Sequence, residues 1–140
     1  MTHKPTVLIV DDDHELRESL RNALETGGYD VAEAQDAEAA LEELKKSSFN
    51  LVLLDLHLPG PSGLEVLRQI KETNQHIRVL MITAYPSSDS AIEALNKAAF
   101  AYLEKPLDMT KLMTKLSRAL AQQQEELFMI KPLSARLEKH

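Results

Sequence analysis

The sequence predicts an α/β fold: a doubly wound, five-stranded parallel sheet with helices on both faces. Five short apolar runs alternate with five segments whose apolar residues recur at helical spacing. Two of the runs, residues 7–10 and 51–54, contain only large apolar side chains, as expected of strands that are buried on both faces. A chain of 140 residues is long enough to form one such domain.

The first strand, residues 7–10, leads directly into three acids, Asp11, Asp12 and Asp13. Carboxylates accept hydrogen bonds from the free N–H groups of a helix N-terminus, which makes Asp13 a candidate N-cap. The helix is predicted over residues 14–26 and ends at Gly27 and Gly28. Its apolar positions recur at helical spacing: Leu16, Leu20, Ala23 and Leu24.

A second strand is predicted over residues 29–34, and Asp36 is the candidate cap of the helix that follows it. That helix carries Ala37, Ala40, Leu41 and Leu44 on one side and ends in residues 47–50. The third strand begins at Leu51 and runs into Asp55. Two prolines and two glycines in residues 59–63 then require a loop before the helix over residues 64–70.

The fourth strand, residues 79–82, ends at Thr83. The helix after it, residues 88–97, is expected to bury Ile92, Leu95 and either Ala98 or Ala99. The last strand, residues 100–103, precedes Lys105. A final helix from about Met109 is expected to bury four apolar side chains, Leu112, Met113, Leu116 and Leu120.

Polar residues follow the strands at their carboxyl ends. Because parallel strands deliver these ends to one edge of the sheet, Asp11, Asp12, Asp55, Thr83 and Lys105 are expected to meet there. Carboxylates this close repel one another unless a cation lies between them. Oxygen ligands favour a hard ion, and Mg²⁺ fits a few carboxylates. The chain has no Cys, and its histidines lack metal-ligand spacing, so a zinc site is not expected.

Phosphoryl transfer is the chemistry that this group of residues supports. The Asp55 carboxylate is ionised at neutral pH and can attack phosphorus without a general base. Lys105 and the metal would neutralise charge on the transferring oxygens, and the Thr83 hydroxyl could hydrogen-bond one of them.

These motifs resemble those of the response-regulator receiver domains of two-component signalling. The resemblance rests on residues 7–13, 53–60, 81–85 and 102–106 and covers about residues 5–122. It implies a flavodoxin-like, chemotaxis-regulator-like fold with strand order 2-1-3-4-5. It also implies a receiver domain over residues 1–122, leaving residues 123–140 as a helical extension or linker tail.

The resemblance also implies a role for each site residue. Asp55 would be the phosphoacceptor, Asp12 a direct Mg²⁺ ligand, Asp11 the holder of a metal-bound water, and the His57 backbone carbonyl a further ligand. Lys105 and Thr83 would contact the phosphoryl group. The Lys105-Pro106 bond would be cis.

The donor would be a phosphohistidine on a sensor histidine kinase or phosphotransfer protein, docking beside residues 16–24. The domain would catalyse its own phosphorylation and dephosphorylation rather than act as a turnover enzyme. The side chains of His57 and Tyr85 would tune the phosphate lifetime. Thr83 would move towards the phosphate and Tyr102 would turn inward, changing the face formed by residues 88–97, the last strand and residues 109–120.

Ala99, where the family usually has Gly, indicates a turn without positive φ.

Composition excludes several classes of protein. A net charge of −6 gives no broad basic surface, so direct nucleic-acid binding is not expected. No apolar stretch is long enough for a membrane span or a signal peptide, which predicts a cytoplasmic protein. The apolar residues 127–130 leave three alternatives open: contact with a second copy, contact with an effector domain outside these residues, or a disordered end.

Two other functions compete with a receiver. A Mg²⁺-dependent phosphatase of the haloacid-dehalogenase type also uses an Asp nucleophile. It needs a second Asp two positions later as general acid, and this chain has His57 there. A nucleotide-binding module needs a Gly-rich phosphate loop, whereas acids occupy the corresponding turn.

Overall fold

The computed structural model describes residues 4–130 and contains one five-stranded parallel sheet in the order β2-β1-β3-β4-β5. The strands are β1 (Thr6–Val10), β2 (Asp30–Ala34), β3 (Leu51–Asp55), β4 (Arg78–Thr83) and β5 (Ala101–Glu104). The helices are α1 (His14–Thr26), α2 (Ala37–Lys46), α3 (Gly63–Thr73), α4 (Ser88–Asn96) and α5 (Met109–Met129). The predicted fold class and strand order are confirmed.

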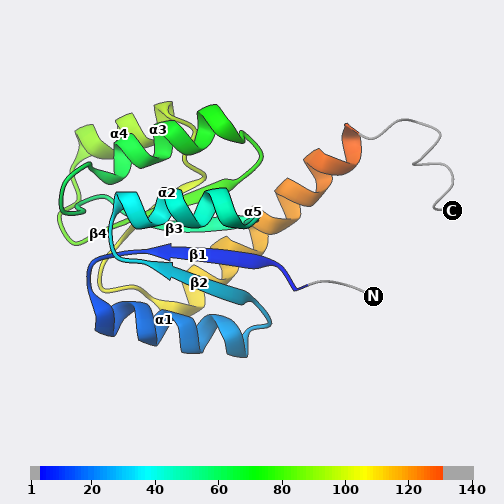
Figure 1. Ribbon diagram of the computed structural model, residues 1–140, viewed down its shortest axis with the longest axis horizontal. Helices are drawn as coiled ribbons and strands as arrows, with labels where there is room; N and C mark the ends of the chain where they lie inside the picture. The colour runs from blue at the N-terminus through cyan, green and yellow to red at the C-terminus, as the bar shows by residue number, and fades with distance from the viewer. Residues whose placement is uncertain (1–3, 131–140) are drawn as a thin grey trace, which may run out of the picture.

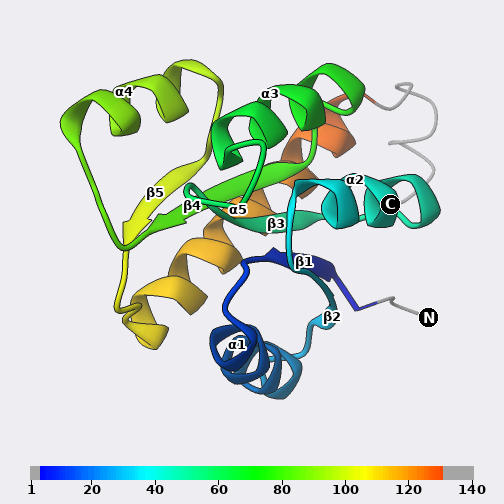
Figure 2. The ribbon, with the colours of Figure 1, turned by 60° about the vertical axis from the view of Figure 1, so that its left-hand side comes forward.

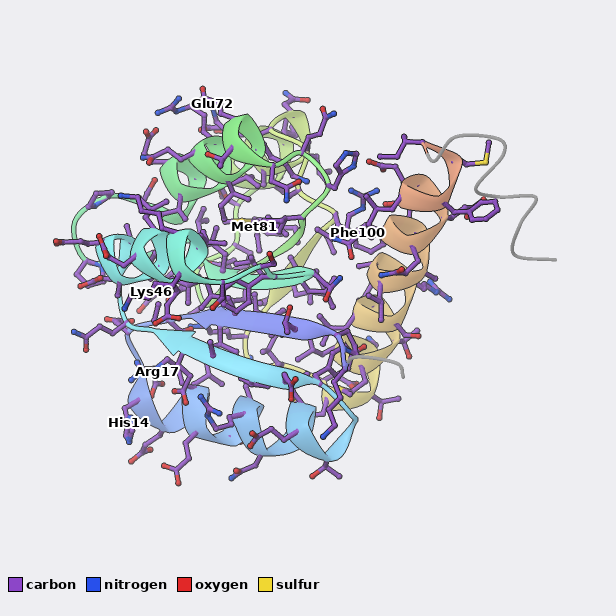
Figure 3. All side chains as sticks on the ribbon, turned by 45° about the vertical axis from the view of Figure 1, so that its right-hand side comes forward. His14, Arg17, Lys46, Glu72, Met81 and Phe100 are labelled. Carbon is purple, nitrogen blue, oxygen red and sulfur yellow. The ribbon has the colours of Figure 1, made fainter. Side chains whose placement is uncertain are left out.

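Helices cover both faces of the sheet (Figures 1 and 2). α1 and α5 pack on one face through a cluster that includes Leu20, Leu24 and Leu116. α2, α3 and α4 pack on the other face, where Met81 lies inside the layer (Figure 3). Alternate residues of β1 and β3 belong to the two clusters, so these strands are buried on both sides, as their continuous apolar sequences predict.

Each helix begins at a short polar side chain that accepts a hydrogen bond from the backbone N–H three residues later. The five N-caps are Asp13, Asp36, Ser62, Ser87 and Asp108. The predicted caps Asp13 and Asp36 are therefore confirmed. α1 ends as predicted at the glycine pair, where Gly28 has a φ of 95°.

The expected buried face of α4 is wrong for Ile92 and Leu95, whereas Ala99, just after the helix, is buried as expected. Ile92 and Leu95 are 57% and 56% exposed, and the buried residue is Ala94. Ser90, one turn before Ala94, lies on the same side of α4 and bonds Tyr102 of β5. Helical periodicity identified the apolar residues, but the side of this short helix that faces the sheet carries a small side chain and a polar contact.

The expectation for the turn after α4 is also wrong, because the turn contains a positive φ of 68° at Ala98. The Ala98 N–H donates to the Leu95 carbonyl and the Ala99 N–H to the Ala94 carbonyl, the hydrogen-bond pattern of a Schellman motif. This motif needs a left-handed residue at Ala98. The sequence-based expectation of a turn without positive φ concerned the next residue, Ala99.

Replacing Ala98 with glycine is expected to raise the free energy of unfolding by about 1 kcal/mol, because glycine adopts this φ without the steric cost of a Cβ. Chemical denaturation would measure the change. Ala91→Gly, inside α4, is the matched control and should lower the stability by a similar amount. Equal effects of the two substitutions would contradict the assignment of strain to Ala98.

α5 continues without a break through residue 122, the predicted end of the receiver, and its last turns are fastened to the amino edge of the sheet. Gln123 is buried and exchanges hydrogen bonds with Asn50, at 2.9 Å in both directions. The Arg78 guanidinium binds Gln122 and Glu126, and His76 also binds Glu126. We name these contacts the α5 clasp. Residues 131–140 of the predicted tail lie outside the described residues.

The α5 clasp is expected to weaken in acid. Hydrogen bonds first from Arg78 and then from His76 lower the pKa of Glu126 below its usual 4.5. A lowered carboxyl pKa stabilises the fold above pH 4.5, and this stabilisation is lost as the pH falls through the folded pKa. Hydrogen exchange of residues 122–129, corrected for intrinsic rates, should therefore accelerate below that pH. Glu126→Gln should remove this dependence, whereas Glu125→Gln at its exposed neighbour should retain it.

Within residues 4–130, no helix combines the length and apolar character needed to cross a membrane.

Candidate functional site

The carboxyl ends of the strands bring the predicted site residues to one edge of the sheet. Backbone hydrogen bonds hold these ends in register: Leu56 N–H donates to the Ile82 carbonyl and Lys105 N–H to the Thr83 carbonyl, at 2.9 and 2.8 Å. Asp11 follows β1, Asp55 ends β3, Thr83 ends β4, and Lys105 follows β5. Residues more than 90 positions apart in sequence therefore meet, as Lys105 and Asp11 do.

Three carboxylates and one ammonium form the centre of this edge. Oxygen atoms of Asp11, Asp12 and Asp55 lie within 4.8 Å of one another. The Lys105 Nζ is 2.7 Å from an Asp11 oxygen and 3.4 Å from an Asp55 oxygen. Asp11 is fully buried, Asp55 is 4% exposed, and Asp12 is exposed. The three acids therefore form a cluster that is buried at Asp11 and open to solvent at Asp12, and we name this cluster the acid pocket.

The charges in this pocket shift the pKa values of Asp55 and Lys105. Burial raises the pKa of Asp55, the His57 N–H opposes that rise, and the Asp11 charge adds to it. Burial alone would lower the pKa of Lys105, but hydrogen bonding and charge from Asp11, and then from Asp55, raise it. Lys105 therefore stays charged and compensates in part for the repulsion between the acids.

The donor set at this edge suits a hard divalent cation. Burial is the main cause of the raised Asp55 pKa, and a cation between the carboxylate oxygens would offset the further rise that the Asp11 charge causes. Asp12 offers exposed oxygens. The oxygens of Asp11, in contrast, accept from the Asp13 N–H and from Lys105, which suits an indirect role. Such all-oxygen sites favour Mg²⁺.

The loop after Asp55 is shaped by two close contacts. The His57 N–H donates to an Asp55 carboxylate oxygen at 3.0 Å, and the Gly63 N–H donates to the Leu56 carbonyl at 2.9 Å. A Cβ at Gly63 would lie 2.2 Å from the Asp55 carbonyl oxygen and 2.9 Å from the Leu56 Cα. The start of α3 can therefore approach the Asp55 backbone only because residue 63 has no side chain.

Replacing Gly63 with alanine is expected to lower the free energy of unfolding by about 2–3 kcal/mol, since backbone must move and helix propensity recovers only part of the loss. Thermal unfolding would measure this. Gly27→Ala is the matched control, because its Cβ would approach the flexible end of Met113 closely but would meet backbone atoms only at ordinary contact distances of 3.4 and 3.5 Å. That variant should change stability by less than about 0.5 kcal/mol. Similar losses in both variants would contradict the close-approach argument.

Arg17 of α1 supports the acid pocket and was missed by the sequence analysis. Its guanidinium donates to the Asp11 carbonyl at 2.7 Å and to Glu33 of β2 at 3.0 Å. Figure 3 shows Arg17 on the side of α1 nearer the sheet than His14. An arginine among polar helix residues has the sequence signature of a solvated face, so no pattern distinguishes it.

The comparisons with known proteins agree with this geometry. Residues 7–117 match the family model described as the response regulator receiver domain. The chain belongs to this family. The receiver domain is 45% identical over 115 residues to the transcriptional regulatory protein ZraR of Klebsiella oxytoca, covering 82% of this chain and 26% of the relative. It is 39% identical over 112 residues to the response regulator protein FleR of Pseudomonas aeruginosa, covering 80% and 24%. The chain thus spans about a quarter of the length of these relatives.

Solved structures show the same fold. A CheY-like response regulator receiver domain protein from Methanospirillum hungatei is 33% identical, with a TM-score of 0.86 and coverage of 89% of this chain and 99% of that one. The signal receiver domain of a putative LuxO repressor protein from Vibrio parahaemolyticus is 28% identical, with a TM-score of 0.87 and coverage of 93% and 100%. The alternative of a haloacid-dehalogenase-type phosphatase finds no support in these matches.

The remaining predicted residues of the receiver domain lie around the acid pocket. Thr83 is fully buried, and its hydroxyl oxygen accepts the Tyr85 N–H at 3.0 Å. The rings of His57 and Tyr85 meet edge to face, with centroids 5.6 Å apart. The Lys105-Pro106 bond is cis, as the family resemblance implied.

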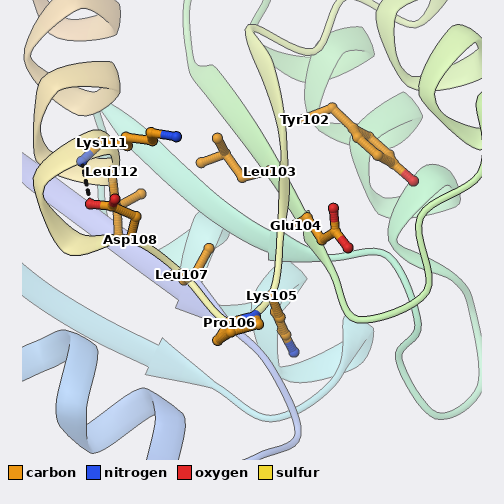
Figure 4. A pocket seen from close by; sticks show the side chains of 9 residues that line it. All are labelled: Tyr102, Leu103, Glu104, Lys105, Pro106, Leu107, Asp108, Lys111 and Leu112. Atoms are coloured by element: carbon orange, nitrogen blue, oxygen red, sulfur yellow. Dashed lines mark hydrogen bonds between the residues drawn. The ribbon is translucent and has the colours of Figure 1, made fainter.

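Tyr102 lies apart from these groups. Its side chain leaves β5 on the side away from α5, whereas Lys105 reaches past the end of the strand (Figure 4). Both residues line a groove of about 350 Å³ along β5 and the start of α5.

Proposed function

We propose that this receiver domain accepts a phosphoryl group on Asp55 from a phosphohistidine of a sensor histidine kinase or phosphotransfer protein. The observation that carries the proposal is the position of the Lys105 ammonium, in contact with both Asp11 and Asp55 at the open edge of the sheet. A cation is thereby held beside the acid that would attack, at the place where the negative phosphoryl oxygens would arrive.

The transfer is a direct displacement. An Asp55 carboxylate oxygen forms a bond to phosphorus as the bond from phosphorus to the donor nitrogen breaks, and that electron pair returns to the imidazole. Lys105 turns from the carboxylates to a phosphoryl oxygen. The Thr83 hydroxyl oxygen already accepts the Tyr85 N–H, so its proton is available to a second phosphoryl oxygen.

A bound Mg²⁺ would be held by Asp12 and Asp55 directly, with the His57 carbonyl as a further ligand and Asp11 holding a metal-bound water. When bound, it would supply positive charge against the developing charge on the phosphoryl oxygens. The mutual approach of the three carboxylates supports this assignment.

The product is a phosphorylated signalling state rather than a released turnover product, so we propose that the domain is a phosphoacceptor and not a turnover enzyme. His57 and Tyr85 flank the pocket as an aromatic pair and would control the access of water to the phosphate. Their contact supports a joint effect on the phosphate lifetime.

The output surface is proposed to be the face formed by α4, β5 and α5, where Ile92 and Leu95 are exposed. A second copy of the chain or an effector domain would bind there, with Thr83 and Tyr102 as the switch residues. The chain covers 26% of the length of its relative ZraR. Binding to an effector domain of a longer protein is therefore part of this proposal. We propose that the phosphoryl transfer to Asp55 takes place in the cytoplasm, where histidine kinases obtain ATP.

The test is intact-mass measurement after incubation with acetyl phosphate and Mg²⁺. One added phosphoryl group per chain is expected, and excess EDTA should prevent the addition. No mass increase with acetyl phosphate, followed by none with a panel of phosphorylated histidine kinases, would contradict the proposal.

A further inference from the structure

A cluster of three hydroxyl groups joins β5 to the first turn of α4, outside the acid pocket. The Tyr102 hydroxyl is 2.6 Å from the Ser90 hydroxyl and accepts the Ser87 N–H at 3.3 Å. The Ser90 hydroxyl also lies 2.9 Å from the Ser87 hydroxyl and 3.2 Å from the Ser87 carbonyl. Tyr102 is thus bound both to the N-cap residue of α4 and to a residue in its first turn.

One arrangement of protons satisfies every bond in the cluster. The Tyr102 hydroxyl donates to the Ser90 oxygen, the Ser87 hydroxyl donates to the same oxygen, and the Ser90 hydroxyl donates to the Ser87 carbonyl. The Ser87 N–H then donates to the Tyr102 oxygen. Ser90 is the centre of this arrangement, because its oxygen accepts both hydroxyl protons.

The cluster is connected to the acid pocket by the loop between β4 and α4. The Tyr85 N–H at one end of this loop is held by the Thr83 hydroxyl, and the Ser87 N–H at the other end is held by Tyr102. A movement of the Thr83 hydroxyl towards a phosphoryl group would therefore pull on a loop that the hydroxyl cluster holds in place.

We infer that Ser90 is a positioning residue: its hydroxyl holds Tyr102 against the N-terminus of α4 and opposes the inward turn of Tyr102 that accompanies phosphorylation. The part of the inference that concerns the inward turn rests on the proposed function. The hydrogen bond between Ser90 and Tyr102 does not, because it is present in the unphosphorylated chain. In Figure 4 the Tyr102 ring points away from α5, and its hydroxyl bonds the start of α4. Ser90 thereby sets how readily the receiver domain switches.

The experiment uses the 140-residue chain labelled with 3-fluorotyrosine and observed by fluorine NMR. The chain has three tyrosines, so Tyr29→Phe and Tyr85→Phe assign the Tyr102 signal. Ser90→Ala retains the backbone N–H that the Ser87 cap accepts, so α4 should keep its start. The Tyr102 signal should shift in this variant without any phosphoryl donor. Affinity for beryllofluoride with Mg²⁺ should rise about three- to tenfold, the value of one hydrogen bond.

Two further variants separate positioning from a general effect on α4. Ser90→Thr retains the hydroxyl and should restore the wild-type signal and affinity. Ser88→Ala removes an exposed hydroxyl from the same helix and should change neither. An unshifted Tyr102 signal in Ser90→Ala, or an equal shift in Ser88→Ala, would overturn the inference. Failure of the wild type to bind beryllofluoride would count against the proposed function instead, because the signal in the unphosphorylated chain does not depend on it.

Discussion

Replacing Asp55 with asparagine should abolish the mass increase that acetyl phosphate and Mg²⁺ produce. The amide nitrogen and oxygen lack the negative charge needed to attack phosphorus, and no other acid of the pocket is placed like Asp55. Asp11 binds Lys105 and the Asp13 N–H through its carboxylate, and Asp12 is exposed, whereas Asp55 is nearly buried and lies beside Lys105. Intact-mass measurement over several hours would show whether any phosphoryl group is added.

The same variant should be no less stable than the wild type. Burial, with the charge of Asp11, raises the Asp55 pKa, so ionisation of this group opposes folding. A raised carboxyl pKa favours the fold at low pH, and that stabilisation is lost as the pH rises through the folded value. The amide that replaces the carboxyl cannot ionise, so the variant should lose less stability than the wild type between pH 4 and neutrality. Asp36→Asn, which retains an N-cap of α2, is the matched control and should be phosphorylated normally. Phosphorylation of the Asp55→Asn chain would refute the assignment.

Replacing Lys105 with methionine is expected to have the second largest effect, reducing the rate of phosphorylation by about 100-fold or more. The ammonium that neutralises the phosphoryl oxygens is lost, whereas the carboxylates remain. Quenched-flow mass spectrometry with acetyl phosphate would measure the rate. Lys111→Met, at an exposed lysine of the same groove, should leave the rate within about twofold of the wild type, since Lys105 is the one of these two lysines that contacts the acids.

The Lys105 variant should also lose about 3 kcal/mol of stability at neutral pH, because buried Asp11 would lose its ion-pair partner. This loss should shrink as the pH falls and Asp55, whose pKa is raised first by burial, takes up a proton, because a neutral Asp55 no longer repels Asp11. Urea denaturation at several pH values would test the trend. A loss independent of pH would indicate lost packing rather than lost charge.

Much of the fold could be predicted because several signals agree in the central strands. Continuous apolar runs, each followed by a polar residue, defined the parallel strands, and the strand ends then placed Asp11, Asp55 and Lys105 together. The rotation of α4 could not be predicted, because the side that faces the sheet carries Ala94 and Ser90, which apolar periodicity does not mark. Arg17 was missed for the same reason: its partners are a backbone carbonyl and a residue of another strand.

Backbone conformation was the other source of error. The left-handed residue at Ala98 lies where the sequence has no glycine, and only the hydrogen bonds of the turn indicate it. Gly63 was identified as a loop residue, but its close approach to the Asp55 backbone depends on how α3 packs. Both constraints depend on how segments pack against one another, and the local amino-acid composition does not indicate them.

The position of α5 has a mechanical consequence. This helix of 21 residues is about 30 Å long, starts three residues after Pro106 and ends at the α5 clasp on the opposite rim of the sheet. α5 therefore connects the edge of the sheet that carries the acids to the opposite edge. A displacement of the segment that carries Lys105 must therefore either shift α5 along its axis or strain the hydrogen bonds of the α5 clasp. The amino edge of the sheet is thus coupled to the acids through α5.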